Sequence, residues 1–112
     1  MNFKDLSDKA MTVKQGYDDL NTVEGNKKWT SAEYMQGFVG DVGDLAKLVM
    51  AKNNYRNIQD VDKKLAHELA DCLWSVMVLA KELDVDLEKE FVSTVDELTR
   101  RINEKVAAAK VK

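Results

Sequence analysis

Two pairs of acidic residues have the spacing that metal chemistry requires. Asp41 and Asp44 lie three residues apart in one apolar stretch, and Glu68 and Asp71 repeat this spacing in another. In a helix, residues three apart project from the same side, about one turn from each other. Their like charges repel, and a hard cation such as Mg²⁺ relieves this repulsion because it prefers carboxylate oxygen ligands. The pattern therefore predicts a metal site shared by two facing helices.

A plainer interpretation of these acidic pairs remains open. The chain has 20 Asp and Glu residues, so pairs three apart also arise by chance and most form a solvated face. Lysines could neutralise them, since Lys47 lies three residues after Asp44 and Lys64 lies four residues before Glu68. Gly40 and Gly43 favour the metal site, because glycine inside a helix costs about 0.5 to 1 kcal/mol relative to alanine. This cost indicates close approach of a helix or a ligand beside the first pair, or simply a packing contact.

Hydrophobic periodicity and capping residues predict four helices that must position these acids. The expected spans are about Phe3 to Val23, Thr30 to between Lys52 and Tyr55, Asp60 to about Leu83, and Leu87 to about Ala107–Ala109. Thr30 and Glu33 form a capping-box pattern at the start of the second helix. Asp60 and Asp86 are the expected N-caps of the third and fourth helices. Asn53 and Asn54 favour a turn after the second helix.

The apolar positions indicate which faces are buried. The stripe expected on the first helix consists of Phe3, Leu6, Ala10, Val13, Tyr17 and Leu20. That of the second consists of Met35, Phe38, Val42, Leu45 and Val49. Between Leu69 and Ala80 the third helix is apolar on nearly every side, which predicts burial both within the subunit and against a second copy. We expect residues 1–112 to form a single all-α domain, a four-helix bundle-like subunit that assembles into a homodimer or homotetramer.

Charge and composition exclude several classes of partner. The net charge is −3 and the sequence pI is about 5.2, so polymeric nucleic acid is not expected to bind. The N-terminal residues lack an apolar signal segment, and the longest low-charge stretch, Cys72 to Ala80, is too short to span a bilayer. Because Cys72 is the single cysteine, no disulfide forms within the chain. We therefore expect a cytoplasmic protein without a membrane partner.

The two acidic motifs resemble those of a known family. Gly40-Asp41-Val42-Gly43-Asp44-Leu45 is similar to a Gly-Glu-Val-Gly-Glu-Leu motif, and His67-Glu68-Leu69-Ala70-Asp71-Cys72-Leu73 to Glu-Glu-Leu-Ser/Ala-Asp-Val-Leu. The last helix of this family is also similar to a segment of the chain, Val85-Asp86-Leu87 followed by Arg100-Arg101. From about Trp29 to Ile102, the chain resembles the MazG-like all-α nucleoside triphosphate pyrophosphohydrolases, which include dCTP pyrophosphatase.

The resemblance implies an activity and a set of site residues. It implies Mg²⁺-dependent hydrolysis of a nucleoside triphosphate between the α and β phosphates, with Mn²⁺ as a possible substitute for Mg²⁺. The residues that fall on metal-ligand and catalytic positions are Asp41, Asp44, Glu68 and Asp71. Those expected to bind substrate are Trp29, Lys47, Arg100 and Arg101. Trp29 has the aromatic face that stacks on a nucleobase.

The chain departs from the family pattern at three places. Asp41 and Asp44 replace the usual glutamates, His67 stands where Glu is common, and Thr94 stands where a Lys often serves the phosphates. Two alternatives therefore stay open. One is a non-catalytic helical oligomer that binds nucleotide, and the other is phosphoribosyl-ATP pyrophosphohydrolase, which shares the fold and the metal chemistry.

Overall fold

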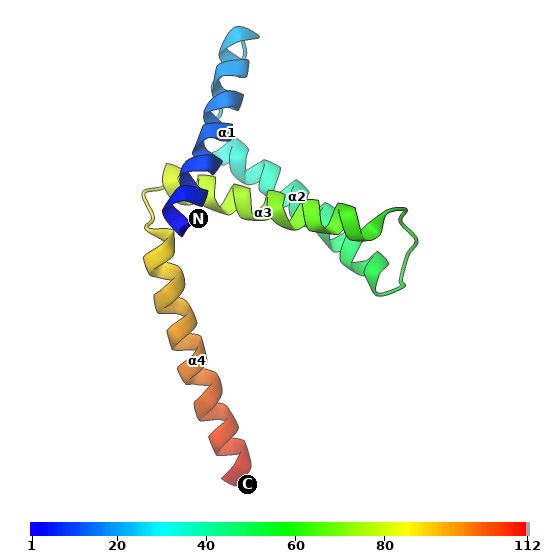
Figure 1. The fold of residues 1–112 in the computed structure, drawn as a ribbon, viewed down its shortest axis with the longest axis vertical. Helices are drawn as coiled ribbons and strands as arrows, with labels where there is room; N and C mark the ends of the chain where they lie inside the picture. The colour runs from blue at the N-terminus through cyan, green and yellow to red at the C-terminus, as the bar shows by residue number, and fades with distance from the viewer. Residues whose placement is uncertain (112) are drawn as a thin grey trace.

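The structure is a computed structural model that describes residues 1–111, and in this range it contains four helices and no strand (Figure 1). The helices are α1 (Phe3–Val23), α2 (Ser31–Lys52), α3 (Val61–Glu82) and α4 (Leu87–Val111). The predicted all-α class, the number of helices and their approximate bounds are confirmed. No helix within residues 1–111 has the length and apolar character needed to cross a bilayer.

Helices α2 and α3 form the main packed unit of the chain. They lie side by side as an antiparallel hairpin, joined by the loop of residues 53–60 (Figure 1). Asn54 and Asp60 turn this loop with positive φ angles of 66° and 56°, a conformation that Asn and Asp tolerate better than most residues. The hairpin therefore holds one face of α2 against one face of α3 over most of their length.

The helix caps follow the prediction only in part. The Asp86 side chain accepts a hydrogen bond from the Lys89 amide at 3.2 Å, as expected for an N-cap. Asp60 occupies the N-cap position of α3, but its side chain makes no capping bond. In the predicted capping box, the Thr30 side chain would accept a hydrogen bond from the Glu33 amide. It accepts from the Ala32 amide instead, so this part of the prediction is wrong.

Helix α1 packs across α3 with a buried face that includes only Ala10 of the predicted stripe. Its buried residues are Ser7, Ala10, Lys14 and Asp18. Leu6, Val13, Tyr17 and Leu20, which belong to the predicted stripe, are 42 to 51% exposed. The prediction is confirmed for Ala10. It was wrong for these four residues because a buried ion pair of Lys14 and Asp18 replaces apolar contacts on the packed face.

The stripe predicted on α2 is also shifted. Tyr34, Leu48 and Ala51 are buried, whereas Met35, Val42 and Val49 are 44 to 45% exposed. Phe38 and Leu45 lie between these extremes. Asp41 shares the face turned toward α3, since it lies seven residues after Tyr34 and seven before Leu48. This register places a carboxylate within the packed interface rather than at its border.

Helix α4 extends away from the other three helices and has no buried residue (Figure 1). The radius of gyration is 18.3 Å, compared with roughly 13 Å for a compact domain of this length. The four helices therefore do not close into a bundle within one subunit, which corrects that part of the predicted architecture. The large apolar side chains that α4 leaves exposed are Phe91, Val92, Val95, Leu98, Ile102, Val106 and Val111.

Candidate metal centre

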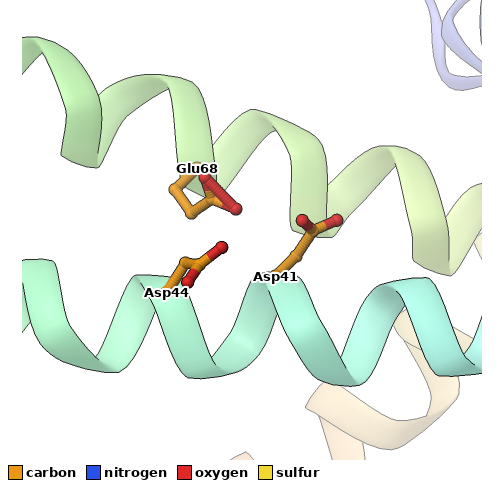
Figure 2. A group of neighbouring side chains, drawn as sticks. All are labelled: Asp41, Asp44 and Glu68. Carbon is orange, nitrogen blue, oxygen red and sulfur yellow. The ribbon is translucent and has the colours of Figure 1, made fainter.

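The α2–α3 hairpin brings three acidic side chains together. Asp41 and Asp44 project from α2 and Glu68 projects from α3, and Figure 2 shows the three pointing toward one another across the interface. One carboxylate oxygen from each lies within 4.8 Å of the others. Asp41 and Glu68 are half-buried, whereas Asp44 is exposed. We call Asp41, Asp44 and Glu68 the acidic trio.

The electrostatics of the trio favour a bound cation. Burial raises the pKa of Glu68 above its ordinary value of 4.5, and its acidic neighbours, Asp41 first among them, raise it further. Glu68 Oε1 is also buried without a hydrogen-bond donor. A buried carboxylate oxygen that lacks a donor is destabilising unless a positive charge compensates it. A divalent cation would supply that charge.

The donor set of the trio fits a hard metal ion. All three side chains offer carboxylate oxygen, which Mg²⁺, Mn²⁺ and Ca²⁺ prefer over softer ligands. Each Asp is one methylene shorter than Glu, yet both reach the same region as Glu68 because the two helices are in direct contact. The shortened first pair is therefore compatible with a shared metal site.

Asp71, the fourth predicted acid, lies beside the trio rather than inside it. Its negative charge contributes to the raised pKa of Glu68 and of Cys72, after the larger effect of burial. One Asp71 carboxylate oxygen lies 3.2 Å from His67 Nε2, one turn earlier on α3. Both side chains are substantially exposed. His67, where the family pattern has Glu, is thus a partner of Asp71 on the surface of α3.

The glycines next to the first pair do not mark a close contact within the subunit. A Cβ built on Gly40 or Gly43 meets no atom within 4 Å among the described residues. Among the described residues, no helix of the same chain makes the expected close approach. A ligand or a second copy remains the alternative explanation for glycine at these positions.

The predicted substrate-binding residues occupy three different places. Lys47 lines a pocket that adjoins Asp44 and Glu68. Trp29 precedes α2 and is 40% exposed. Arg100 and Arg101 lie on α4, where they pair with Glu104 and Glu97 of the same helix. Within one subunit, α4 points away from the α2–α3 hairpin and does not bring these arginines to the trio (Figure 1).

Trp29 is part of an aromatic cluster that the sequence analysis did not foresee. Its ring is nearly parallel to that of Tyr17, with centroids 6.4 Å apart, and meets the Tyr34 ring edge-on at 5.4 Å. Trp74 contacts both tyrosines, and its Nε1 donates a 3.0 Å hydrogen bond to the Ala10 carbonyl. The cluster therefore joins α1, the start of α2 and the middle of α3.

A buried polar network beneath this cluster was also missed. The Lys14 ammonium contacts Asp18 and, at 2.8 Å, Glu82 of α3. The Tyr34 hydroxyl donates a 3.0 Å hydrogen bond to Asp18. Burial would raise the pKa of Asp18, but the hydrogen bonds from Lys14 and Tyr34 outweigh it, so the pKa lies below the ordinary value. Burial and the bond to Asp18 raise the pKa of Tyr34 to about 12.

The sequence contained one signal for this network. Lys14 and Asp18 are four residues apart, the spacing of a helical ion pair, and Ser7 and Ala10 lie on the same face. Their burial could not be inferred, because i,i+4 pairs of this kind usually lie on the solvent face. The network fixes α1 against α2 and α3, the two helices that carry the acidic trio.

Four helices with a carboxylate trio between two of them define an all-α protein with a candidate site for a divalent metal. Residues 30–106, more than half of the chain, match the MazG nucleotide pyrophosphohydrolase domain. The chain therefore belongs to the MazG nucleotide pyrophosphohydrolase family and is a hydrolase that acts on phosphoanhydride bonds of nucleotides. Searches among curated proteins and among solved structures gave no match.

Proposed function

We propose that this protein is a Mg²⁺-dependent nucleoside triphosphate pyrophosphohydrolase that releases a nucleoside monophosphate and pyrophosphate. The convergence of Asp41, Asp44 and Glu68 within 4.8 Å carries this proposal. These residues are two members of the first family motif and one of the second. Mn²⁺ is the expected substitute for Mg²⁺, because it has a similar preference for oxygen ligands.

The acidic residues have distinct tasks in this reaction. Asp41, Asp44 and Glu68 hold the metal between α2 and α3, and Asp71 completes the acidic set from the next turn of α3. A bound divalent cation neutralises phosphate charge and acidifies water. A carboxylate of this acidic set then accepts the proton of the attacking water. Positioning and charge neutralisation supply most of the rate enhancement in phosphate chemistry.

The aromatic cluster is the proposed site for the nucleobase. Trp29 and Tyr17 expose 40% and 47% of their surface, so part of each residue is accessible to a ligand. Trp74, one turn beyond Asp71 on α3, connects the cluster to the acidic residues. Stacking on aromatic rings does not by itself distinguish one base from another, so the substrate class is a ribo- or deoxyribonucleoside triphosphate.

The proposed enzyme is a homodimer or homotetramer. Apolar side chains exposed on all four helices, with no closed bundle in one subunit, support burial against further copies of the chain. Arg100 and Arg101 of one copy would then serve the site of another. The net charge of −3 argues against polymeric nucleic acid as a partner, and a cytoplasmic location agrees with a nucleotide substrate.

Pyrophosphate release from a panel of ribo- and deoxyribonucleoside triphosphates with Mg²⁺ tests this function. At least one nucleotide should release pyrophosphate, and chelation of the metal should abolish release. The Asp71→Asn and Glu68→Gln variants should release much less than the native protein. If no nucleotide gives release above these variants, the proposal is wrong.

A further inference from the structure

A pocket rich in lysine adjoins the acidic trio on the side of the 53–60 loop. It has a volume of about 550 Å³ and lies between α2, this loop and α3, a size typical of small-molecule sites. Asp44 and Glu68 of the trio line one side. The remaining lining residues are Lys47, Leu48, Ile58, Asp60, Lys63, Lys64 and His67. We call this site the lysine pocket.

The three lysines of the pocket form no ion pair with any acidic side chain of residues 1–111. Among residues 1–111, no carboxylate lies within 4.0 Å of the ammonium of Lys47, Lys63 or Lys64. Lys52, close to the same loop, is different because it pairs with Asp62. The lysines of the pocket are therefore available to an anionic ligand.

The acids that line the pocket do not cancel this positive charge once a metal is present. Two of the three acids, Asp44 and Glu68, belong to the trio, where a divalent cation would offset two of the three negative charges that they carry together with Asp41. The one charge left on the trio and that of Asp60 then oppose three lysines, so the balance stays positive. The metal and the lysines together make one extended positive surface, which suits a ligand with several adjacent negative charges.

The order of residues along α3 places the trio between the lysine pocket and the aromatic cluster. Glu68 lies four residues after Lys64 and six before Trp74, which corresponds to about 6 Å and about 9 Å along the helix axis. On the antiparallel α2, Lys47 follows Asp44 and Tyr34 precedes Asp41. Both helices thus present an aromatic end, an acidic centre and a basic end in the same spatial order.

We propose that the lysine pocket binds the distal phosphates of the substrate, and that Lys63 and Lys64 with Lys47 hold the pyrophosphate that leaves. This inference rests on the proposed function and gives the nucleotide a direction along the α2–α3 hairpin. The nucleoside lies toward the aromatic cluster and the scissile bond lies at the acidic trio. The β and γ phosphates extend toward the loop of residues 53–60.

Calorimetric titration of the native protein with inorganic pyrophosphate at saturating Mg²⁺ tests this assignment. A Lys63→Gln/Lys64→Gln double variant should bind pyrophosphate roughly tenfold more weakly, because it loses two charge-assisted contacts. Its rise in melting temperature with Mg²⁺ alone should match the native rise, since the trio is intact. A Lys9→Gln/Lys110→Gln variant carries the same change of net charge away from the pocket and should bind pyrophosphate as the native protein does.

Two results would overturn the assignment. One is native affinity for pyrophosphate in the Lys63→Gln/Lys64→Gln variant. The other is a greater loss in a Lys27→Gln/Lys28→Gln variant, which would place the phosphates at the aromatic end. Because binding is measured without turnover, a protein that hydrolyses no nucleotide but loses pyrophosphate affinity in the pocket variant refutes the proposed function and supports the pocket.

Discussion

Replacement of Glu68 by Gln should change the stability of the protein in opposite directions with and without metal. In the metal-free protein, Glu68 has two carboxylates with oxygens within 4.8 Å. The Coulomb repulsion for one such pair ranges from about 0.9 kcal/mol in water to about 3.5 kcal/mol at an effective dielectric constant near 20. Because Asp44 is exposed and salt screens the charges, the lower value of the repulsion applies. The two pairs together therefore destabilise the folded protein by about 1 to 2 kcal/mol.

The expected result is a higher melting temperature for metal-free Glu68→Gln. Relief of this repulsion corresponds to an increase of roughly 4 to 8 °C for a chain of this size. With Mg²⁺ at a hundred times its dissociation constant, the native protein should gain about 2.7 kcal/mol, while the variant should gain little. The order of the two melting temperatures should therefore reverse when metal is added.

Differential scanning calorimetry at one fixed protein concentration is the assay, because association would also shift the melting temperature. Glu104→Gln on α4 is the matched control, since the ion pair of Glu104 with Arg100 lies on an exposed surface. It should show no reversal. A metal-free Glu68→Gln protein less stable than the native one, or a native gain with Mg²⁺ that the variant retains, would refute the reasoning.

The stability difference between the native protein and Glu68→Gln should depend on pH, because the pKa of Glu68 is raised. The native state binds this proton more tightly than the unfolded state, whose pKa is near 4.5. The cost of the charged Glu68 is therefore present above its folded pKa and declines as the pH falls from there toward 4.5. The stability advantage of metal-free Glu68→Gln should shrink over this interval, and an advantage independent of pH would contradict the assigned cause.

Three further variants test the packing around the site. Asp18→Asn leaves Lys14 with only Glu82 and should cost about 2 to 3 kcal/mol in chemical denaturation, whereas Asp8→Asn on the same helix should cost little; equal effects would contradict the buried network. Gly43→Ala should stabilise the metal-free fold by about 0.5 to 1 kcal/mol because the added Cβ meets open space, and a destabilised monomer would refute this. Ile102→Asp should reduce the mass measured by analytical ultracentrifugation while Thr94→Asp does not, and an unchanged mass would argue against α4 as an interface.

The sequence was sufficient to predict the helices and the acidic motifs. Capping residues and glycine or asparagine breaks marked the helix ends to within a few residues, because these signals are local. The three-residue spacing placed Asp41 and Asp44 on one side of α2 and fixed their relation to Glu68 once the two helices paired. The family motif needs only such local features, which is why the resemblance was confirmed.

The packed faces could not be predicted with the same success. Leu6, Val13 and Val42 satisfy helical periodicity but remain exposed in one subunit, because periodicity does not distinguish a face that packs within the chain from one that packs elsewhere. The burial of Lys14 and Asp18 was missed because charged residues are rarely buried unless they are paired. The sequence alone does not show which charged residues pair in a buried position. Long-range pairing, such as the bond from Tyr34 to Asp18, has no local signal.

The products formed from a nucleoside triphosphate test the central claim most directly. Phosphorus NMR of a reaction with Mg²⁺ should show a nucleoside monophosphate and pyrophosphate in equal amounts, with no nucleoside diphosphate. The Glu68→Gln protein should leave the triphosphate intact under the same conditions. Orthophosphate with a nucleoside diphosphate, or equal turnover by the Glu68→Gln variant, would contradict a pyrophosphohydrolase that works through the acidic trio.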